Sequence, residues 1–377
     1  MISGERFSVL YHLTGNEKEA YAKAQDICVE QTIEYPFELL APGFIKDEVV
    51  GHIESFTALP DNQGYRAAIS YAIEIAANEL TQLLNVVFGN ISIKPGILVD
   101  KLILPESLLK AFKGPRFGRE GLRQLLGVFD RPLLFVAIKP MGFSSVQLAD
   151  IVYQCALGGI DIIKDDHGLS NQIFAPFEER VTLCSEAVHR ANRETGRKSI
   201  YVANITGPAN KILSRAQFAK QAGAGGLLAS PALIGLDTMR WLSDGDNLAL
   251  PIISHPAFQG SYVTSAAHGF GFSHYALYGQ ISRLAGADAV IYPNFGGRFS
   301  FSIEQCHSIV RGTEEAMGHI KTIFPSPGGG MTIERIPELL DEYGKDVIFL
   351  MGGGLFKQGS DLVKYCRHFL DLVKKDR

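Results

Sequence analysis

Eight short runs of apolar residues divide the chain after Pro132, and helical stretches separate them. The runs cover residues 133–139, 160–164, 199–205, 225–230, 250–255, 289–294, 321–326 and 347–351. Each run is continuously apolar rather than alternating, which indicates strands covered on both faces, as in a parallel sheet inside a shell of helices. Eight such units in succession predict an α/β fold, a (β/α)8 TIM barrel. A doubly wound open sheet, which usually has fewer strands, is the less favoured alternative.

The first 110 residues lack this rhythm and mix helix and strand. We expect strands over 6–15 and 49–59, and a helix over 16–33 that Asn16 caps. A second helix is expected over 70–79 and a further strand over 80–90, with an irregular linker over 103–131. The prediction is a smaller α+β N-terminal domain over 1–125 and a barrel catalytic domain over 126–377.

Composition narrows the class of partner. The net charge is −4 and the pI is near 6.2, and no long Lys/Arg run occurs, so nucleic acid is not expected as a partner. No stretch of 18 apolar residues and no signal-type start occur, so we expect no membrane partner and a cytoplasmic location. The five cysteines are widely spaced, as buried free thiols in a reducing cytosol would be.

In such a barrel the active site is built where the strands end. The first run ends in Lys139, the second in Lys164-Asp165-Asp166-His167, the third in Asn204 and the fifth in His255. Glycine-rich turns at 328–330 and 352–354 follow the last two runs. Two lysines, two aspartates and two histidines therefore converge on one mouth, opposite turns whose N–H groups suit phosphate.

Each of these features also has an ordinary structural explanation. The glycines suit tight turns, Asp165 and Asp166 suit helix caps or solvated positions, and His255 suits a hydrogen-bonded core histidine. Lys164 is harder to explain in this way, because a lysine directly after IDII points into the core or the mouth. Desolvation there would lower its pKa and suit it to basic or carbamate chemistry.

These residues carry a family likeness. GGIDIIKDDHG resembles the GG-hydrophobic-D-x-x-KDDE signature of ribulose bisphosphate carboxylase (RuBisCO), and RPLLFVAIKPMGFS resembles the first barrel strand of that family. GHIESFTA, with Glu54, and VVFGN, with Asn90, resemble the N-terminal segments that reach into a neighbouring subunit's site. APFEERV, ISHPAF and PGGGM are most similar to the RuBisCO-like, or form IV, proteins.

The resemblance implies a Mg²⁺ site, but one of its ligands differs in this sequence. It makes Lys164 the lysine that CO2 carbamylates, with the carbamate and Asp166 as ligands of Mg²⁺. The place of the third ligand, a carboxylate in the carboxylases, holds His167. Imidazole suits Mg²⁺ less well than oxygen does, so the metal differs, binds more weakly, or His167 is an acid/base group.

Other departures also argue against a carboxylase. Met141 stands for the second active-site lysine, Pro256 for a phosphate-gripping arginine and Tyr292 for a histidine. The loop after residue 294 offers only Arg298, a predicted substrate-binding residue together with Asn204, in place of the lid lysine. The final glycine pairs persist and imply one surviving phosphate site, formed by Gly329, Gly330, Gly352 and Gly353.

The implied enzyme forms an enediolate from a small phosphorylated sugar or sugar acid without fixing CO2. Lys139 is the favoured proton donor or acceptor, and His255 and His167 orient hydroxyls or relay protons. The first hypothesis is a lyase that decarboxylates or transcarboxylates a substrate of the 3-oxo-isoapionate 4-phosphate type. The second is a proton-transfer isomerase or enolase acting on a methylthio-pentulose 1-phosphate. The third is a degenerate binding protein without turnover.

The resemblance also predicts assembly. Glu54 and Asn90 would complete the partner's site, so the expected active unit is a symmetric homodimer with shared active sites. The alternative is that both residues are ordinary surface or capping groups.

Overall fold

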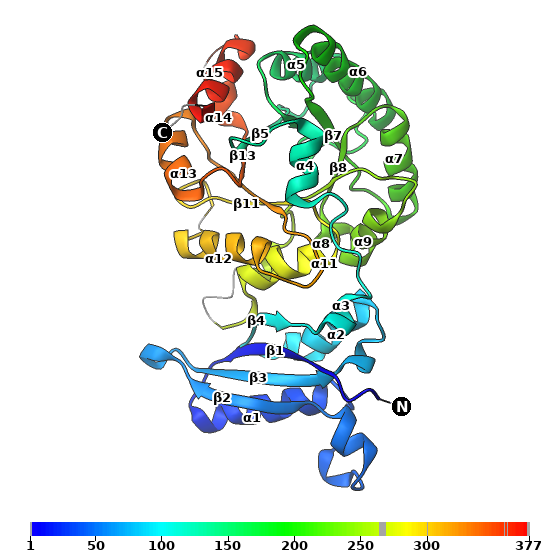
Figure 1. The fold of residues 1–377 in the computed structure, drawn as a ribbon, viewed down its shortest axis with the longest axis vertical. Helices are drawn as coiled ribbons and strands as arrows, with labels where there is room; N and C mark the ends of the chain where they lie inside the picture. The colour runs from blue at the N-terminus through cyan, green and yellow to red at the C-terminus, as the bar shows by residue number, and fades with distance from the viewer. Residues whose placement is uncertain (1, 264–268, 300, 358, 360, 375–377) are drawn as a thin grey trace.

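The computed structural model describes residues 2–263, 269–299, 301–357, 359 and 361–374, and it shows two domains (Figure 1). A smaller sheet domain, built from the N-terminal part of the chain, lies beside one side of a ring of strands and helices. The ring comes from the rest of the chain.

The N-terminal domain is a sheet with helices packed on it. Its strands are β1 (Arg6–Leu13), β2 (His52–Ala58), β3 (Tyr65–Ala72) and β4 (Ile97–Ile103), and its main helices are α1 (Glu17–Glu30) and α2 (Leu80–Phe88). Alternate residues of β1 are buried, as expected for a strand with one face in the core. The expected cap is confirmed: Asn16 accepts from the Glu19 N–H, and the Glu19 side chain accepts from the Asn16 N–H.

Two predictions for this domain are wrong. The α-helix expected over 70–79 is absent: residues 70–72 end strand β3, and Ile73–Ala76 form only a 3-10 turn. β3 lies between β1 and β2, and ladder pairing on both sides outweighs the helix propensity of its alanines. The strand expected over 80–90 is helix α2, which buries Leu80, Leu83 and Val87, and their spacing places them on one helical face.

The eight predicted barrel strands are all present. They are β5 (Leu133–Ala137), β6 (Ile162–Lys164), β7 (Ile200–Asn204), β8 (Gly226–Ala229), β9 (Ile252–Ser254), β11 (Ala289–Pro293), β12 (Phe324–Gly328) and β13 (Ile348–Met351). They form one parallel sheet in the order β12-β11-β9-β8-β7-β6-β5-β13. Contacts between β12 and β13 bring the two ends of this order together, so the barrel fold is confirmed.

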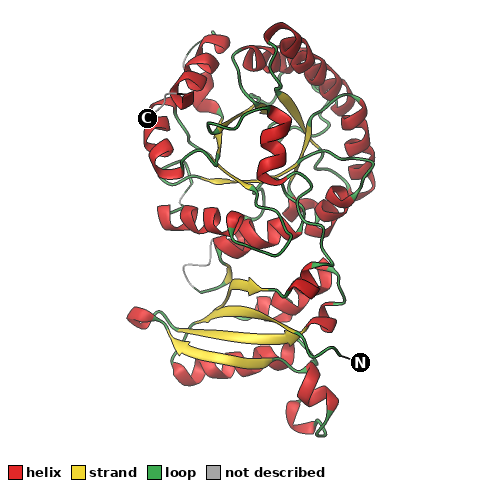
Figure 2. Ribbon diagram, in the orientation of Figure 1, coloured by secondary structure: helices red, strands yellow, loops and turns green. Residues whose placement is uncertain are grey.

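Helices surround the strands (Figure 2). The longer ones are α5 (Ser145–Leu157), α6 (Phe177–Thr195), α7 (Ala209–Gln221), α9 (Leu236–Asp244), α12 (Ile303–Glu314), α13 (Ile336–Tyr343) and α15 (Leu362–Lys374). Between β9 and β11 the shell is a π-helical turn, η7 (Tyr275–Ile281), that continues into α11 (Ser282–Leu284). The chain also has short helices: α3 (Glu106–Leu109), near α2 of the N-terminal domain in Figure 1, and α8 (Pro231–Ile234), α10 (Gly260–Val263) and α14 (Gly353–Phe356) in the rest of the chain.

The segment expected to be an irregular linker contains a helix, α4 (Gly118–Leu126), as well as the short α3. Asp288 Oδ1 accepts from the N–H groups of Phe117 and Gly118, each at 2.7 Å, and the Arg119 N–H donates to Thr322 O. These contacts hold α4 across the amino ends of the strands, the barrel opening that faces the viewer in Figure 1. The catalytic mouth is therefore the opposite opening.

A strand from the barrel's own loops joins the two domains. β10 (Gly271–Phe272) adds to the N-terminal sheet in parallel with β4. The Gln280 side chain bonds both backbone groups of Leu102, accepting at 2.8 Å and donating at 2.7 Å. Because these backbone groups are buried, their pairing fixes how the domains dock.

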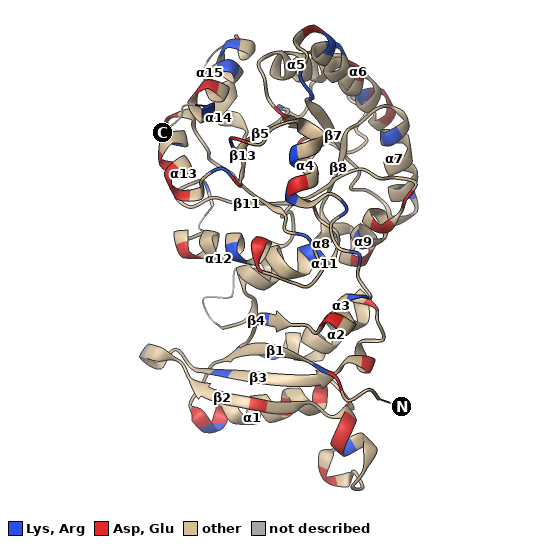
Figure 3. Cartoon of the chain, viewed as in Figure 1, with Lys and Arg blue, Asp and Glu red and all other residues tan. Residues whose placement is uncertain are grey.

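Basic and acidic residues are interspersed along the helices and strands, as the colours of Figure 3 show. None of the described helices is long and apolar enough to cross a membrane. All five cysteines are free and buried, as predicted.

A buried ion pair fixes the amino end of β6. Arg131 donates to both oxygens of Asp161, at 2.7 and 2.8 Å, and Asp161 also accepts from the Leu134 N–H. Both side chains are less than a tenth exposed. Asp161, the aspartate within GGIDIIK, therefore ties β6 to β5 and is a structural residue.

We expect Asp161→Ala to lower the midpoint of urea unfolding strongly, because it leaves the Arg131 charge buried and unpaired at a cost of about 3–5 kcal/mol. Asp130→Ala is the control, since Asp130 is exposed and one residue from the same arginine. Equal midpoints for the two variants would contradict the role given to the pair.

Candidate active site

Residues that follow β5 and β6 meet around one carboxylate at the mouth. Lys139, two residues beyond β5, forms an ion pair with Asp166 Oδ2. His167 Nδ1 lies 2.8 Å from Asp166 Oδ1. Burial would raise the pKa of Asp166, but hydrogen bonds from His167 and Lys139 and the charge of Lys164 outweigh it and hold the pKa well below its usual range. Asp166 is therefore a carboxylate in any physiological buffer.

Lys164 ends β6 and is almost wholly buried. Its ammonium donates to the backbone oxygen of Asp165 at 3.0 Å. Burial, helped by the like charge of Lys139, lowers the pKa of Lys164 to about 8 against the opposing pull of Asp166 and Asp165. The lowered pKa favours the neutral amine, which is the form that basic or carbamate chemistry would require.

His255, just after β9, stacks on His167 with ring centroids 4.4 Å apart and planes 15° from parallel. Its Nδ1 accepts from the Ala257 N–H at 3.1 Å, so the ring proton of the neutral form is on Nε2. Burial and the nearby charge of Lys164 lower the pKa of His255 well below its usual value. At neutral pH His255 is an uncharged hydrogen-bond donor.

Asn204 and Asp165 lie behind these groups. Asn204 Nδ2 donates to the backbone oxygens of His167 and Leu169, each at 2.9 Å, and its Oδ1 accepts from the Thr206 N–H. The fully buried Asp165 accepts from Arg180 and Tyr201. These contacts give Asn204 a bracing role for the loop after β6, while its predicted contact with substrate stays a prediction.

The two glycine pairs lie at the same rim. A Cβ built on Gly352 would approach Lys139 Cε at 3.8 Å, so the turn after β13 adjoins the Lys139 side chain. A Cβ on Gly330 would lie 2.7 Å from the backbone nitrogen of Arg298. The N–H of that backbone nitrogen donates to Gly329 O. Gly329 and Gly330 both have positive φ, and only glycine fits this close packing of two loops.

Two further side chains frame the mouth. Arg298 is exposed, with its guanidinium over the Phe299 ring. The half-exposed Met141 lies over Gly168, where an added Cβ would meet Met141 Cε at 2.6 Å. The site of the expected second lysine is thus an apolar wall beside His167.

Glu54 and Asn90 contact only residues of the N-terminal domain among the hydrogen bonds of the described residues. Glu54 accepts from the Ser70 hydroxyl at 2.5 Å, and Asn90 donates to Glu30 at 3.1 Å. Lys94 is also within 3.8 Å of Glu30. Glu30, which the sequence reasoning did not single out, is therefore the carboxylate that the fold places beside Asn90.

The donor set tests the expected metal. Across the described residues no group of three or more His, Cys, Asp or Glu side chains is arranged to hold a metal ion. Asp166 is the single carboxylate among Lys139, Lys164, Asp166 and His167, and it is engaged by Lys139 and His167. Lysine without a carbamate donates no oxygen, so these residues as they lie do not fit Mg²⁺.

Comparisons with known proteins agree with the fold. Residues 118–360 match the family model described as the ribulose bisphosphate carboxylase large chain, catalytic domain. The chain is 32% identical to ribulose bisphosphate carboxylase-like protein 1 of Rhodopseudomonas palustris over 98% of both chains. It is also 32% identical to 5-methylthioribulose-1-phosphate isomerase of Rhodospirillum rubrum, over 98% of this chain and 96% of that one.

A solved structure extends the likeness to three dimensions. The crystal structure of a RuBisCO-like protein from R. palustris superposes with a TM-score of 0.88, at 33% identity over 99% of both chains. The chain belongs to the RuBisCO large-chain family and, within it, to the RuBisCO-like proteins.

Proposed function

We propose that this protein forms an enediolate from a phosphorylated ketose by proton transfer, as an isomerase or enolase, and does not fix CO2. The observation that carries the proposal is the arrangement around Asp166: one carboxylate holds a lysine and a histidine, and a second histidine stacks on the first. The isomerase activity named for the R. rubrum relative supports the same reaction class.

His167 is the proposed proton acceptor. With Nδ1–H donated to Asp166, the neutral ring presents its Nε2 lone pair. The side chain is half exposed, so a substrate at the mouth can reach it. A carboxylate behind an imidazole fixes the tautomer and stabilises the imidazolium that forms when the ring takes a proton.

His255 and Lys139 are the proposed stabilisers of the developing oxyanion. His255 offers a neutral Nε2–H beside His167, and Lys139 brings a positive charge that is paired with Asp166. Donors already oriented toward forming charge account for much of enzymatic rate enhancement. The ion pair with Asp166 favours the charged form of Lys139. Of the two roles expected from the sequence, proton donor or proton acceptor, we therefore propose the donor, which also stabilises negative charge.

The phosphate of the substrate would lie against the glycine pairs. Gly352 adjoins Lys139, and a Cβ on Gly353 would meet no atom within 4 Å, so the backbone there is open to a ligand. The name of the R. rubrum relative includes a phosphorylated substrate. We infer a single phosphate, since Pro256 stands where the resemblance places the arginine that would grip a second phosphate.

We further propose that two copies complete each other's sites. Glu54 and Asn90 are exposed, and each hydrogen-bonds only within the N-terminal domain among the described residues. Both could therefore reach the active site of a neighbouring copy, as the resemblance implies. Asn90, beside Glu30 and Lys94, is the better placed of the two to act within a polar cluster.

Decarboxylation would form the same enediolate. It differs from the proposed proton transfer because CO2, rather than a proton, leaves the carbon next to the carbonyl. Incubating the protein in D2O separately with 5-methylthioribulose 1-phosphate and with 3-oxo-isoapionate 4-phosphate separates the two. We expect deuterium to enter the carbon next to the carbonyl without release of CO2, read by NMR and mass spectrometry. The lyase would be established instead if CO2 were released from 3-oxo-isoapionate 4-phosphate and no deuterium entered 5-methylthioribulose 1-phosphate.

We expect Lys139→Met to reduce kcat about 10²–10⁴-fold, because it removes the cation that stabilises the oxyanion. It also removes a like charge beside Lys164, so the pKa of Lys164 rises and any basic limb of the pH–rate profile moves to higher pH. The control is Lys198→Met, an exposed lysine before β7 at the opposite end of the barrel. Wild-type kcat in Lys139→Met would remove this lysine from the mechanism.

We expect Mg²⁺ to bind measurably only in bicarbonate, because the described donor set needs the oxygens of a Lys164 carbamate. Calorimetric titration with MgCl2 near pH 8, with and without bicarbonate, tests this. Lys164→Met, which cannot be carbamylated, should show no bicarbonate-dependent heat. Equal binding without bicarbonate would show that the metal uses other ligands.

A further inference from the structure

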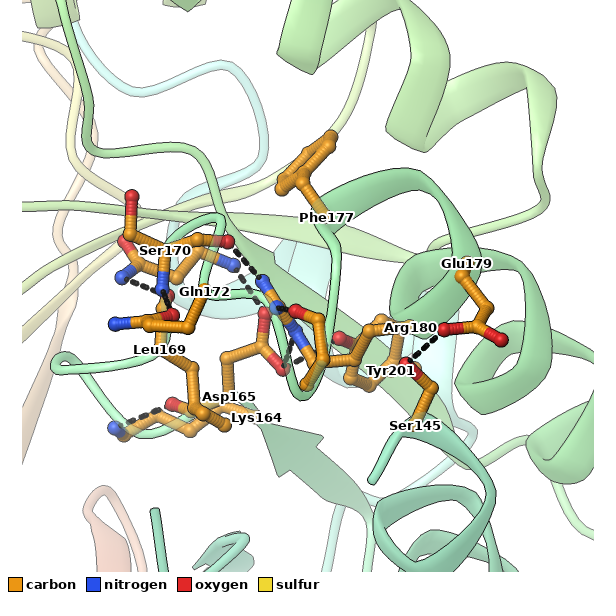
Figure 4. Close-up of polar contacts among 12 residues, drawn as sticks. Ser145, Lys164, Asp165, Leu169, Ser170, Gln172, Phe177, Glu179, Arg180 and Tyr201 are labelled. Carbon is orange, nitrogen blue, oxygen red and sulfur yellow. Dashed lines mark hydrogen bonds and ion pairs between the residues drawn. The ribbon is translucent and has the colours of Figure 1, made fainter. Parts of the chain in front are cut away.

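We propose that Arg180 and Tyr201 act through Asp165 as positioning residues for the catalytic loop. We call Asp165, Arg180 and Tyr201 the Asp165 network, and Figure 4 shows its contacts. The inference rests on the proposed function, because it concerns the aim of Lys164, Asp166 and His167. The three network residues are buried, each at most 1% exposed, and none is among the groups proposed to contact substrate.

Asp165 is held from three directions. Its Oδ1 accepts from Tyr201 OH at 2.6 Å and Arg180 Nε at 3.2 Å, and its Oδ2 accepts from the Asn204 N–H at 3.0 Å. A carboxylate with three donors in a dry interior has one orientation. Asp165 is therefore neither the helix cap nor the solvated residue that sequence alone allows.

Arg180 also fixes the far part of the same loop. Its two terminal nitrogens donate to Ala175 O at 2.7 Å and to Ser170 O at 2.9 Å. Within the loop, Gln172 donates to Gly168 O and accepts from the Ser170 N–H. One guanidinium thus ties the start, middle and end of residues 165–175 together.

The network connects to the chemistry through a single peptide. The backbone oxygen of Asp165 accepts from Lys164 Nζ, and the next residue is Asp166, which holds Lys139 and His167. Turning the Asp165 side chain would turn this peptide, moving the acceptor of Lys164 and the carboxylate of Asp166 at once. A displacement of about 1 Å at reacting groups can cost about 10²-fold in rate.

A buried Arg–Asp ion pair lies at each end of β6. Comparing the two pairs therefore distinguishes an effect on the position of the loop from an effect on stability. Arg131–Asp161 lies at the amino end, away from the mouth, and Arg180–Asp165 lies at the carboxyl end. Arg180 and Asp165 offset each other's charge, so the network acts on the mouth by geometry rather than by added field. The place of the Arg180–Asp165 pair at the mouth end of β6, rather than its burial, is what assigns it the positioning role.

The test uses two variants, each with a matched control. Tyr201→Phe removes one buried hydroxyl from Asp165, and Tyr11→Phe removes one buried hydroxyl that bonds Val87 O in the N-terminal domain. Arg180→Lys loses the fork over the loop, and Arg131→Lys loses the fork at the other end of β6. Arg180→Ala is avoided, because it strands a buried carboxylate and is expected to unfold the chain.

Two readouts are taken below the melting temperature of every variant: kcat and KM on the phosphorylated ketose, and the ring N–H resonance of His167 in 15N-histidine-labelled protein. Loss of the resonance in His167→Asn assigns it. We expect Tyr201→Phe and Arg180→Lys to lower kcat tenfold or more with KM within about twofold, and to shift the His167 resonance, while both controls leave kcat and the resonance unchanged.

Equal effects of each variant and its control on kcat and on the resonance would overturn the inference and leave the network a matter of stability. The resonance is measured without substrate. If wild-type protein turns over no phosphorylated ketose, the proposed function fails, and the response of the His167 resonance still decides whether the network positions the loop.

Discussion

A buried strand that ends in four ionisable residues must find a partner for each charge, and the mouth of this barrel is organised by that requirement. Lys164 turns to a backbone oxygen, Asp165 to Arg180 and Tyr201, and Asp166 to Lys139 and His167. Arg180 lies on α6, Tyr201 on β7 and Lys139 just after β5, whereas the Asp165 oxygen and His167 belong to the same segment as Lys164. An unpaired buried charge costs several kcal/mol. The charged groups at the end of β6 therefore need their partners on β7 and α6 and just after β5, and this requirement fixes how those elements pack around β6.

The pairing divides the Lys-Asp-Asp-His run into a part that faces substrate and a part that faces the core. Asp166 and His167 point to the mouth, whereas Asp165 is turned away and fully buried. Lys164 lies between the two, buried enough to titrate near pH 8 and next to the charges that tune it. In the proposed mechanism, the Asp166 carboxylate that Lys139 and His167 share acts with them as an acid/base unit.

The barrel was predictable because its signal is repeated eight times and each strand is buried on both faces. The same rule located Lys139, Lys164, Asp166 and His255 at one rim, since strand ends in a parallel barrel must converge. The N-terminal domain was harder: β3 is a strand because of its neighbours, and α2 carries an apolar run that fits either period. Arg180 and Tyr201 could not be assigned, because no periodicity tells which buried polar group meets which.

Glu30 illustrates the same limit for the shared-site prediction. Its proximity to Asn90 depends on how α1 packs beside the turn after α2, a contact between residues 60 positions apart. Glu54, chosen from its local segment, instead bonds Ser70 on the neighbouring strand. Local sequence identifies which segments carry polar groups, and tertiary packing decides which of those groups act together. The same holds for His167, the proposed base: the neighbouring Asp166 orients it, and the packing of β9 brings His255 against its face.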